Sequence, residues 1–182
     1  YRIAEPDALT ELEERARQVD WSKVINNEIV TASVRNYRPE GLKRLSRTAK
    51  PRTRNIDMTY TLEMDIPDGK GGILYPKGFV FNPLDYLPPY PFTQIFIDGN
   101  DPEQVAWFKM KYGKDLNVKL IITDGGFFEL SQELGRPVFY AQPVMIERLR
   151  LEAAPSVVRQ RERMMEVSEI DVSAELKKLE SR

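Results

Sequence analysis

Hydrophobic residues near the amino end recur at the spacing of a helix. The run begins after Pro6 and Asp7, which suit a first helical turn, and its apolar members lie three or four residues apart: Leu9, Leu12, Ala16 and Val19. Such a stripe either packs on its own domain or binds a partner helix, and the pattern favours neither reading. We therefore expect an amino-terminal helical segment over residues 1–34, with Leu9 and Leu12 as candidate partner contacts.

A strand-type pattern appears at residues 55–65, where apolar and polar side chains alternate. The alternation predicts a strand with one buried face. Turn-forming residues at 67–72 and 76–78 precede two short apolar runs, 73–75 and 79–81. We expect a small antiparallel β unit of these three strands. Its apolar face should pack on something else, because so small a sheet is not stable alone.

Strand-type and helix-type segments alternate over residues 92–182. A buried strand at 92–97 leads through Asp98 and Gly99 into a helix capped by Asp101, with Pro102 at its first position. Later elements are expected at 118–123 (strand), 127–134 (helix), 138–140 (strand), 145–149 (helix), 156–160 with 164–167 (hairpin) and around Val172, Leu176 and Leu179 (helix). This order indicates an α/β fold of the thioredoxin-like type.

The stretch EAAPSVVRQ, residues 152–160, bears on that fold class. Proline has no N–H for a sheet ladder, so Pro155 is expected to open the strand that follows it. Thioredoxin-like domains have a cis-proline at this place, and we predict that the Ala154–Pro155 bond is cis. Their reactive Cys-x-x-Cys pair lies at the start of the first core helix, but this chain has no cysteine. We therefore expect a cysteine-free thioredoxin-like domain at 92–182 that has kept the fold without the reaction.

A basic run precedes the β unit. Eight Lys or Arg residues and one acidic residue lie between Arg35 and Arg54, interrupted by Pro39, Gly41 and Pro51. A segment of this kind buries too little surface to fold. We predict a linker at 35–54 without regular structure, open to trypsin, which is solvated or lies on an acidic protein surface. Nucleic acid is not the expected partner, because aromatic residues for base stacking are missing beyond Tyr37.

The NPLDY motif at residues 82–86 and the prolines after it form a connection that completes the segment 55–91. Pro83 biases Asn82 away from helix, and the prolines at 88, 89 and 91 favour an extended chain. Its apolar and aromatic side chains either hold the β unit to the next domain or contact a partner protein. The candidate partner contacts are Asn82, Pro83, Leu84, Tyr86 and Tyr90.

Composition narrows the chemistry. The 182 residues are 41% hydrophobic and 30% charged, with a net charge of −1, and no apolar run is long enough for a transmembrane segment. The absence of cysteine and histidine removes disulfides, thiol chemistry, the usual general base and the commonest metal ligand. Asp98 and Asp101 lack the spacing of a calcium loop and are expected to serve a turn and a helix cap. We expect a protein that is not an enzyme and has no cofactor or metal.

Three stretches carry a family resemblance: IAEPDALTELEERA at the amino end, GGILYPKGFVFNPLDYLPPYPFTQIFIDGNDPEQVAWFK in the middle, and VFYAQPVMIERLRLEAAPSVVRQ later. Together they resemble the TraW family of F-type conjugative type IV secretion systems. The similarity is weakest over the basic run and after Val167. Where some F-type proteins have a late cysteine, this chain reads VMIE, residues 144–147, which argues against a redox role.

The resemblance implies a function and a location. It implies export to the periplasm after removal of a signal peptide, which the first residue Tyr1 fits as well as it fits a trimmed chain. It also implies a role in pilus assembly through contacts with other transfer proteins, TrbC first and TraU second. The alternative is a periplasmic chaperone or peptide-binding module with a redox-inactive thioredoxin-like fold.

Overall fold

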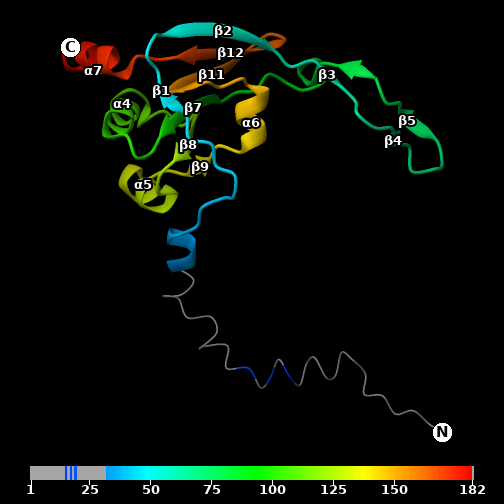
Figure 1. The fold of residues 1–182 in the computed structure, drawn as a ribbon, viewed down its shortest axis with the longest axis horizontal. Helices are drawn as coiled ribbons and strands as arrows, with labels where there is room; N and C mark the ends of the chain where they lie inside the picture. The colour runs from blue at the N-terminus through cyan, green and yellow to red at the C-terminus, as the bar shows by residue number, and fades with distance from the viewer. Residues whose placement is uncertain (1–14, 16, 18, 20–31, 182) are drawn as a thin grey trace. The chain divides into compact units, whose positions relative to one another are not determined.

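A mixed sheet of six strands organises this protein, in the order β2-β12-β11-β7-β8-β9 (Figure 1). The structure is a computed structural model that describes residues 15, 17, 19 and 32–181. The strands of this sheet are β2 (Arg52–Asp57), β7 (Thr93–Asp98), β8 (Val118–Asp124), β9 (Val138–Tyr140), β11 (Ser156–Arg161) and β12 (Met164–Glu169). Within residues 38–181 the helices are α4 (Pro102–Tyr112), α5 (Phe127–Leu134), α6 (Pro143–Arg148) and α7 (Val172–Glu180), with one 3₁₀ turn, η1 (Pro83–Asp85).

Strand directions follow from the connections. Helix α4 joins β7 to the parallel strand β8, and α5 joins β8 to the parallel strand β9. Strands β11 and β12 form an antiparallel hairpin, and β11 pairs antiparallel with β7. The element order predicted over residues 92–182 is confirmed, and with it the α/β class.

Two apolar cores lie on opposite faces of the sheet, and strand β7 contributes side chains to both. It is therefore buried on both sides. Ile95 and Ile97 belong to the core that α4, α5 and α7 complete, where Trp107 and Phe108 are fully buried. Phe96 belongs to the other core, which receives Ile146 and Leu149 from α6 and the segment after it. The sheet is therefore covered by helices on one face and by α6 with its loops on the other.

The predicted linker at 35–54 is wrong toward its carboxyl end, where two short stretches are strands. Residues Ser46–Arg47 form strand β1, and Arg52–Asp57 form β2, which pairs antiparallel with β12 along six residue pairs. Leu45 and Thr48 are buried. Local composition did not predict β2, because the carboxylates that bind Arg52 and Arg54 lie about a hundred residues later in the chain.

Those carboxylates are Glu152 and Glu169. Glu169 is 3% exposed and accepts hydrogen bonds from Arg52 Nε at 2.6 Å and Arg54 Nη2 at 2.9 Å. Glu152 accepts from the same two arginines, and the hydrogen bond from Arg52 is the main reason that the pKa of Glu152 lies below its usual value. This four-residue set, called the arginine–glutamate cluster below, holds β2 at the sheet edge.

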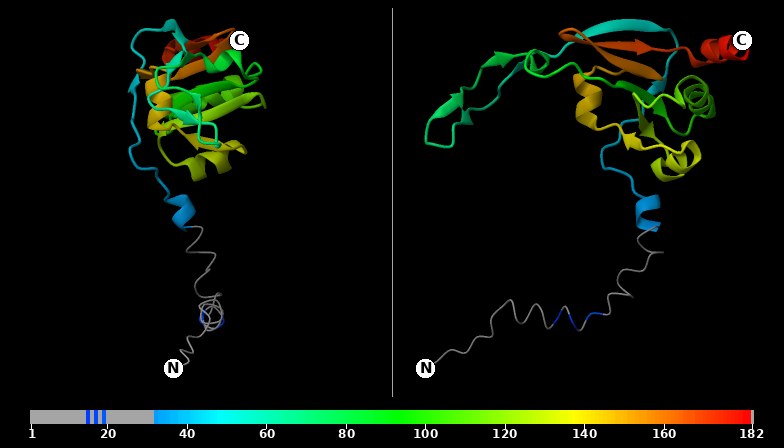
Figure 2. Two further views of the ribbon diagram at one scale, coloured as in Figure 1. Left: turned by 90° about the vertical axis from the view of Figure 1, so that its right-hand side faces the viewer. Right: turned by 180° about the vertical axis from the view of Figure 1, so that it is seen from behind.

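The single strand predicted at 55–65 is also wrong. The carboxylate of Asp57 accepts hydrogen bonds from the backbone N–H and the hydroxyl of Thr59, which turns the chain out of the sheet. The chain continues as two short ladders, β3 (Tyr60–Thr61) with β6 (Val80–Phe81) and β4 (Ile66–Pro67) with β5 (Ile73–Tyr75). We call residues 60–81 the arm, which extends away from the sheet (Figure 2). We expected its apolar face to pack on something else; among the residues that the structure describes nothing covers its tip, where Met64, Ile73 and Leu74 are more than half exposed.

Of the amino-terminal segment 1–34, the structure describes residues 32–34, which are helical, and Arg15, Arg17 and Val19. Leu9 and Leu12 lie outside the described residues, so their role stays a prediction.

Replacing Glu169 by alanine is expected to release strand β2. The change leaves Arg54, which is 24% exposed, without its buried carboxylate, and we expect a loss of roughly 2 kcal/mol in the free energy of unfolding, less than for a fully buried pair because both arginines reach solvent. Trypsin should then cut after Arg52 or Arg54, bonds that the unaltered protein protects. Urea unfolding and mass spectrometry of the first fragments measure both effects.

The control is Glu166→Gln, which removes an outer ion pair to Arg161 at 3.5 Å from the same strand. It should leave stability and cleavage unchanged. Equal trypsin sensitivity at Arg52 and Arg54 in all three proteins would contradict the account of the cluster.

Candidate protein-docking surface

The turn between β7 and α4 is built around two aspartates that bind other groups of the chain. Asp98 is 4% exposed and accepts hydrogen bonds from Arg44 Nε at 2.8 Å and from the backbone N–H of Asn100 at 2.9 Å. Asp101 caps α4 by accepting from the backbone N–H of Glu103 and Gln104, with Pro102 at the first helical turn. The predicted cap is confirmed.

Gly99 lets two loops meet at this end of the sheet. Its N–H donates to the carbonyl of Asp124 at 2.9 Å, and a Cβ on Gly99 would lie 2.8 Å from that oxygen. Gly125, which faces it, has a φ of +105° that side chains disfavour. The glycine in the predicted turn is therefore required by the close approach of β7 and β8.

Residues 44–48, called the strap below, lie across this end. Strand β1 pairs in parallel with β10 (Ala153–Ala154), and Thr48 N donates to Ala154 O at 2.8 Å. Arg47 binds Glu103 and lies 3.6 Å from Asp101. The bond after β10, Ala154–Pro155, is cis as predicted.

The strap occupies the charged side chains at this end of the sheet. A polar hollow of about 480 Å³ remains between Arg44, Arg47, Asp98, Asp101 and Gln104, but its carboxylates already hold arginines or cap α4. Within residues 32–181, no group of three acidic side chains could bind a metal ion. The arrangement closes the start of α4 rather than presenting a reactive group.

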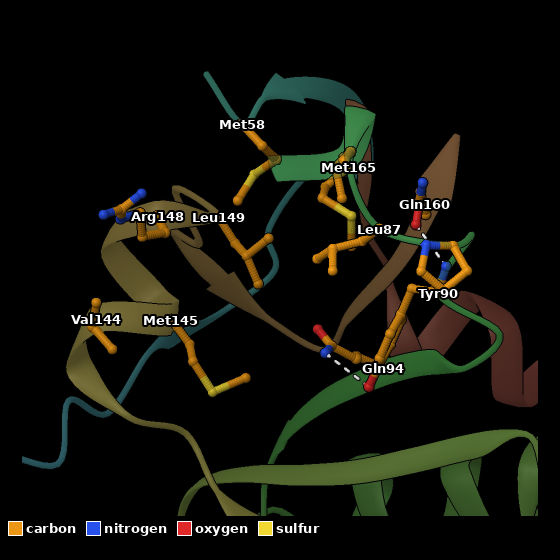
Figure 3. A pocket seen from close by; sticks show the side chains of 12 residues that line it. Met58, Leu87, Tyr90, Gln94, Val144, Met145, Arg148, Leu149, Gln160 and Met165 are labelled. Atoms are coloured by element: carbon orange, nitrogen blue, oxygen red, sulfur yellow. Dashed lines mark hydrogen bonds between the residues drawn. The ribbon is translucent and has the colours of Figure 1, made fainter. Parts of the chain in front are cut away.

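A different surface is open and apolar. A groove of about 340 Å³ lies between α6, the β11–β12 hairpin and the segment after η1 (Figure 3). Its lining residues are Met58, Leu84, Leu87, Pro88, Tyr90, Gln94, Val144, Met145, Arg148, Leu149, Gln160 and Met165. A second hollow of about 540 Å³ lies along the arm, lined by Leu62, Ile66, Tyr75, Phe79, Phe81, Pro83, Tyr86 and Leu87. Leu87 lines both, so we treat groove and arm hollow as one docking surface.

The NPLDY motif lies where these two hollows meet. Asn82 is 5% exposed; its amide donates to Arg163 O at 2.9 Å, and its carbonyl oxygen accepts from Leu84 N at 3.0 Å. Asn82 thus serves the chain's own turn, with the extended backbone that Pro83 predicts. Pro83 faces the arm hollow and Leu84 the groove.

Tyr86 and Tyr90 differ in exposure. Tyr86 is 72% exposed, and its ring contacts Phe81 edge-on at 6.3 Å. Tyr90 is half-buried, donates its backbone N–H to Gln160 Oε1 at 2.7 Å, and packs its ring on Phe92 at 5.7 Å. The structure therefore offers Tyr86 to solvent and builds Tyr90 into the fold.

Several residues of this surface were not identified from sequence as contacts. Val144 is 57% exposed, whereas Met58, Met145 and Met165 turn their side chains into the groove. Met58 and Met165 lie in the segments 55–65 and 164–167, which the sequence predicted to be strands. They carry no local signal for a groove, because it is formed by segments far apart in the sequence.

These features define a class of protein: a mixed α/β protein with a closed polar end and an open apolar docking surface. None of the helices that the structure describes is long and apolar enough to cross a membrane. The sequence is similar to Protein TraW of Escherichia coli (strain K12), with 32% identity over 163 residues, which cover 87% of this chain and 77% of that protein. The chain belongs to the TraW family. No family model matches the sequence, and no solved structure matches it.

Replacing Gly99 by alanine is expected to destabilise the protein by about 1–3 kcal/mol, because the new Cβ would push β7 away from the carbonyl of Asp124. Asn100→Ala is the matched control, since Asn100 is the next residue and is exposed. Urea unfolding of both variants measures the difference. Equal stability of the two would contradict the close approach of the two loops.

Proposed function

We propose that this protein is a non-catalytic periplasmic component of an F-type conjugative type IV secretion system, required for pilus assembly through contacts with other proteins. Membership of the TraW family supports the system. The single observation that supports action by contact is the docking surface, where Tyr86 and Leu87 expose 72% and 61% of their area. Exposed apolar patches of this extent mark interaction sites in proteins.

We propose further that residues 92–182 form a cysteine-free thioredoxin-like domain. The strand order β8-β7-β11-β12, with β11 antiparallel to β7, supports this assignment. In such a domain the start of α4 would be the reactive end. Here Arg44 and Arg47 of the strap pair with its carboxylates, which supports a structural rather than a catalytic use.

The proposed partners are other transfer proteins, TrbC first and TraU second. Nucleic acid is not proposed, because the arginines at 44, 47, 52 and 54 bind carboxylates of the chain and are not arranged for phosphates. A periplasmic chaperone or peptide-binding module is the second candidate, and the open groove favours it. A chaperone would suppress the aggregation of unrelated unfolded proteins, whereas an assembly component would not.

Alanine substitutions of the two tyrosines, Tyr86 and Tyr90, are expected to have different effects, one on partner binding and the other on stability. Tyr86→Ala should keep the melting temperature, with a change in the free energy of unfolding below about 0.5 kcal/mol, because the side chain is exposed. It should lose copurification of TrbC from cell envelopes. Tyr90→Ala should destabilise by about 2 kcal/mol, because its ring packs on Phe92.

Leu116→Ala serves as the control for loss of an exposed large side chain, since Leu116 is 89% exposed and lines neither hollow. It should retain TrbC. Full recovery of TrbC with Tyr86→Ala would defeat the proposed contact.

A further inference from the structure

The apolar groove has a cation on each of two sides and no acidic residue in its lining. Arg148, at the end of α6, is exposed and lines the groove. Figure 3 shows Tyr90 on the opposite side from Arg148, and Lys119 of β8 lies over the Tyr90 ring. Lys119 is half-buried and is paired in register with Gln94, another lining residue. Of the described residues that line the groove, none is Asp or Glu.

Aromatic rings, and not carboxylates, hold these two cations. The guanidinium of Arg148 lies 4.3 Å from the centre of the Tyr60 ring. Lys119 Nζ lies 4.5 Å from the centre of the Phe92 ring and 5.4 Å from that of Tyr90. Among residues 32–181, neither cation forms an ion pair with a carboxylate. A ring face positions a cation but does not neutralise its charge.

Two arginines of the nearby β11–β12 hairpin are used differently. They pair with carboxylates at 3.5 Å and 2.6 Å: Arg161 with Glu166, and Arg163 with Asp85. Glu147, the sequence neighbour of Arg148, is exposed and does not line the groove. The positive charges of Arg148 and Lys119 are therefore not balanced by a carboxylate of the groove.

We propose that the groove binds an acidic amphipathic segment of a partner protein, whose apolar side chains enter the groove and whose carboxylates meet Arg148 and Lys119. Charge complementarity selects this class of occupant, because the groove joins apolar walls to positive charge and has no negative charge in its lining. A basic segment would bring like charges together and bind less tightly. The flexible methionine side chains on the walls adapt to apolar side chains of different shape.

An anionic lipid shares part of this chemistry, since an acyl chain also fits apolar walls. A lipid has its anionic group at one end, however, whereas the two cations lie beside Tyr60 and beside Tyr90. That placement favours an occupant with carboxylates on both sides of its apolar residues. The inference rests on the proposed function in taking the occupant to be another transfer protein, and it adds the charge and the pattern of the segment that binds.

The test is a peptide titration of the full chain, followed by the methyl resonances of methionine. The methionines that line the groove are Met58, Met145 and Met165. Those outside it, which serve as internal controls, are Met64, Met110 and Met164. The probe is the peptide Glu-Leu-Ala-Ala-Leu-Glu with both ends blocked, and its analogues have glutamine or lysine in place of both glutamates.

The acidic peptide is expected to shift the groove methyls in a saturable way. It should bind roughly fivefold more tightly than the glutamine analogue, a modest factor because exposed ion pairs contribute little each. The lysine analogue should bind most weakly. The preference for the acidic peptide should disappear as salt is raised, because exposed charges are screened.

Variants of the two cations separate charge from packing. Arg148→Gln and Lys119→Gln should each reduce the preference for the acidic peptide, while the groove methyls still respond to the glutamine analogue. Arg148→Lys keeps the charge and should keep the preference. The matched control is Arg161→Gln, since Arg161 does not line the groove and pairs with Glu166. It should leave binding of all the peptides unchanged.

Each of several outcomes would overturn the proposal. Equal binding of the acidic and glutamine peptides would exclude selection by charge, and equal shifts of all the methionine methyls, or none, would exclude the site. Groove shifts from lysophosphatidylglycerol monomers at a lower concentration than from the acidic peptide would assign the groove to a lipid. Tighter peptide binding by a Leu9→Ser, Leu12→Ser variant than by the unaltered chain would assign it to the chain's own amino-terminal segment. The titration uses purified protein, so its failure is distinct from a failure of TrbC copurification, which tests the proposed function.

Discussion

The arginine–glutamate cluster is the interaction on which the rest of the structure depends. Glu169 on β12 and Glu152 before β10 bind Arg52 and Arg54, so a segment that composition marks as solvated becomes the sixth strand of the sheet. The arm starts from that strand and returns through η1 to β7. Without β2 fixed at the edge, the arm would have one attachment instead of two, and Met58 would not be held against the core that borders the groove.

The same basic segment closes the end of the domain that lies away from the arm (Figure 1). Arg44 and Arg47 hold the strap against the start of α4, and β1 pairs with β10 just before the cis bond to Pro155. A helix amino terminus attracts anions, and here Asp101 and Glu103 satisfy it. The side chains at the start of α4 are thus engaged in internal bonds, and the open apolar area lies around the arm and α6.

The sequence predicted what depends on local pattern. The cap Asp101 with Pro102, the strand entry at Pro155 and the hairpin after it are each set by neighbouring residues, and the structure has them. Prediction failed where the deciding partner is remote. Eight basic residues could not reveal Glu152 and Glu169, and the alternation at 55–65 could not reveal the turn at Asp57 and Thr59. Of the candidate contacts, Tyr86 and Leu87 could be expected from the sequence, whereas Met145 and Gln94 come together in the groove only through the fold.

The central claim is that the surface around Leu87 receives another transfer protein. Site-specific photo-crosslinking in intact cell envelopes tests it most directly, with a benzophenone amino acid placed at Leu87 or Ile73, both largely exposed, or at Leu116, which is 89% exposed and lies outside both hollows. The account predicts crosslinks to a transfer protein from positions 87 and 73 and none from 116. Crosslinks from position 116 alone would contradict it.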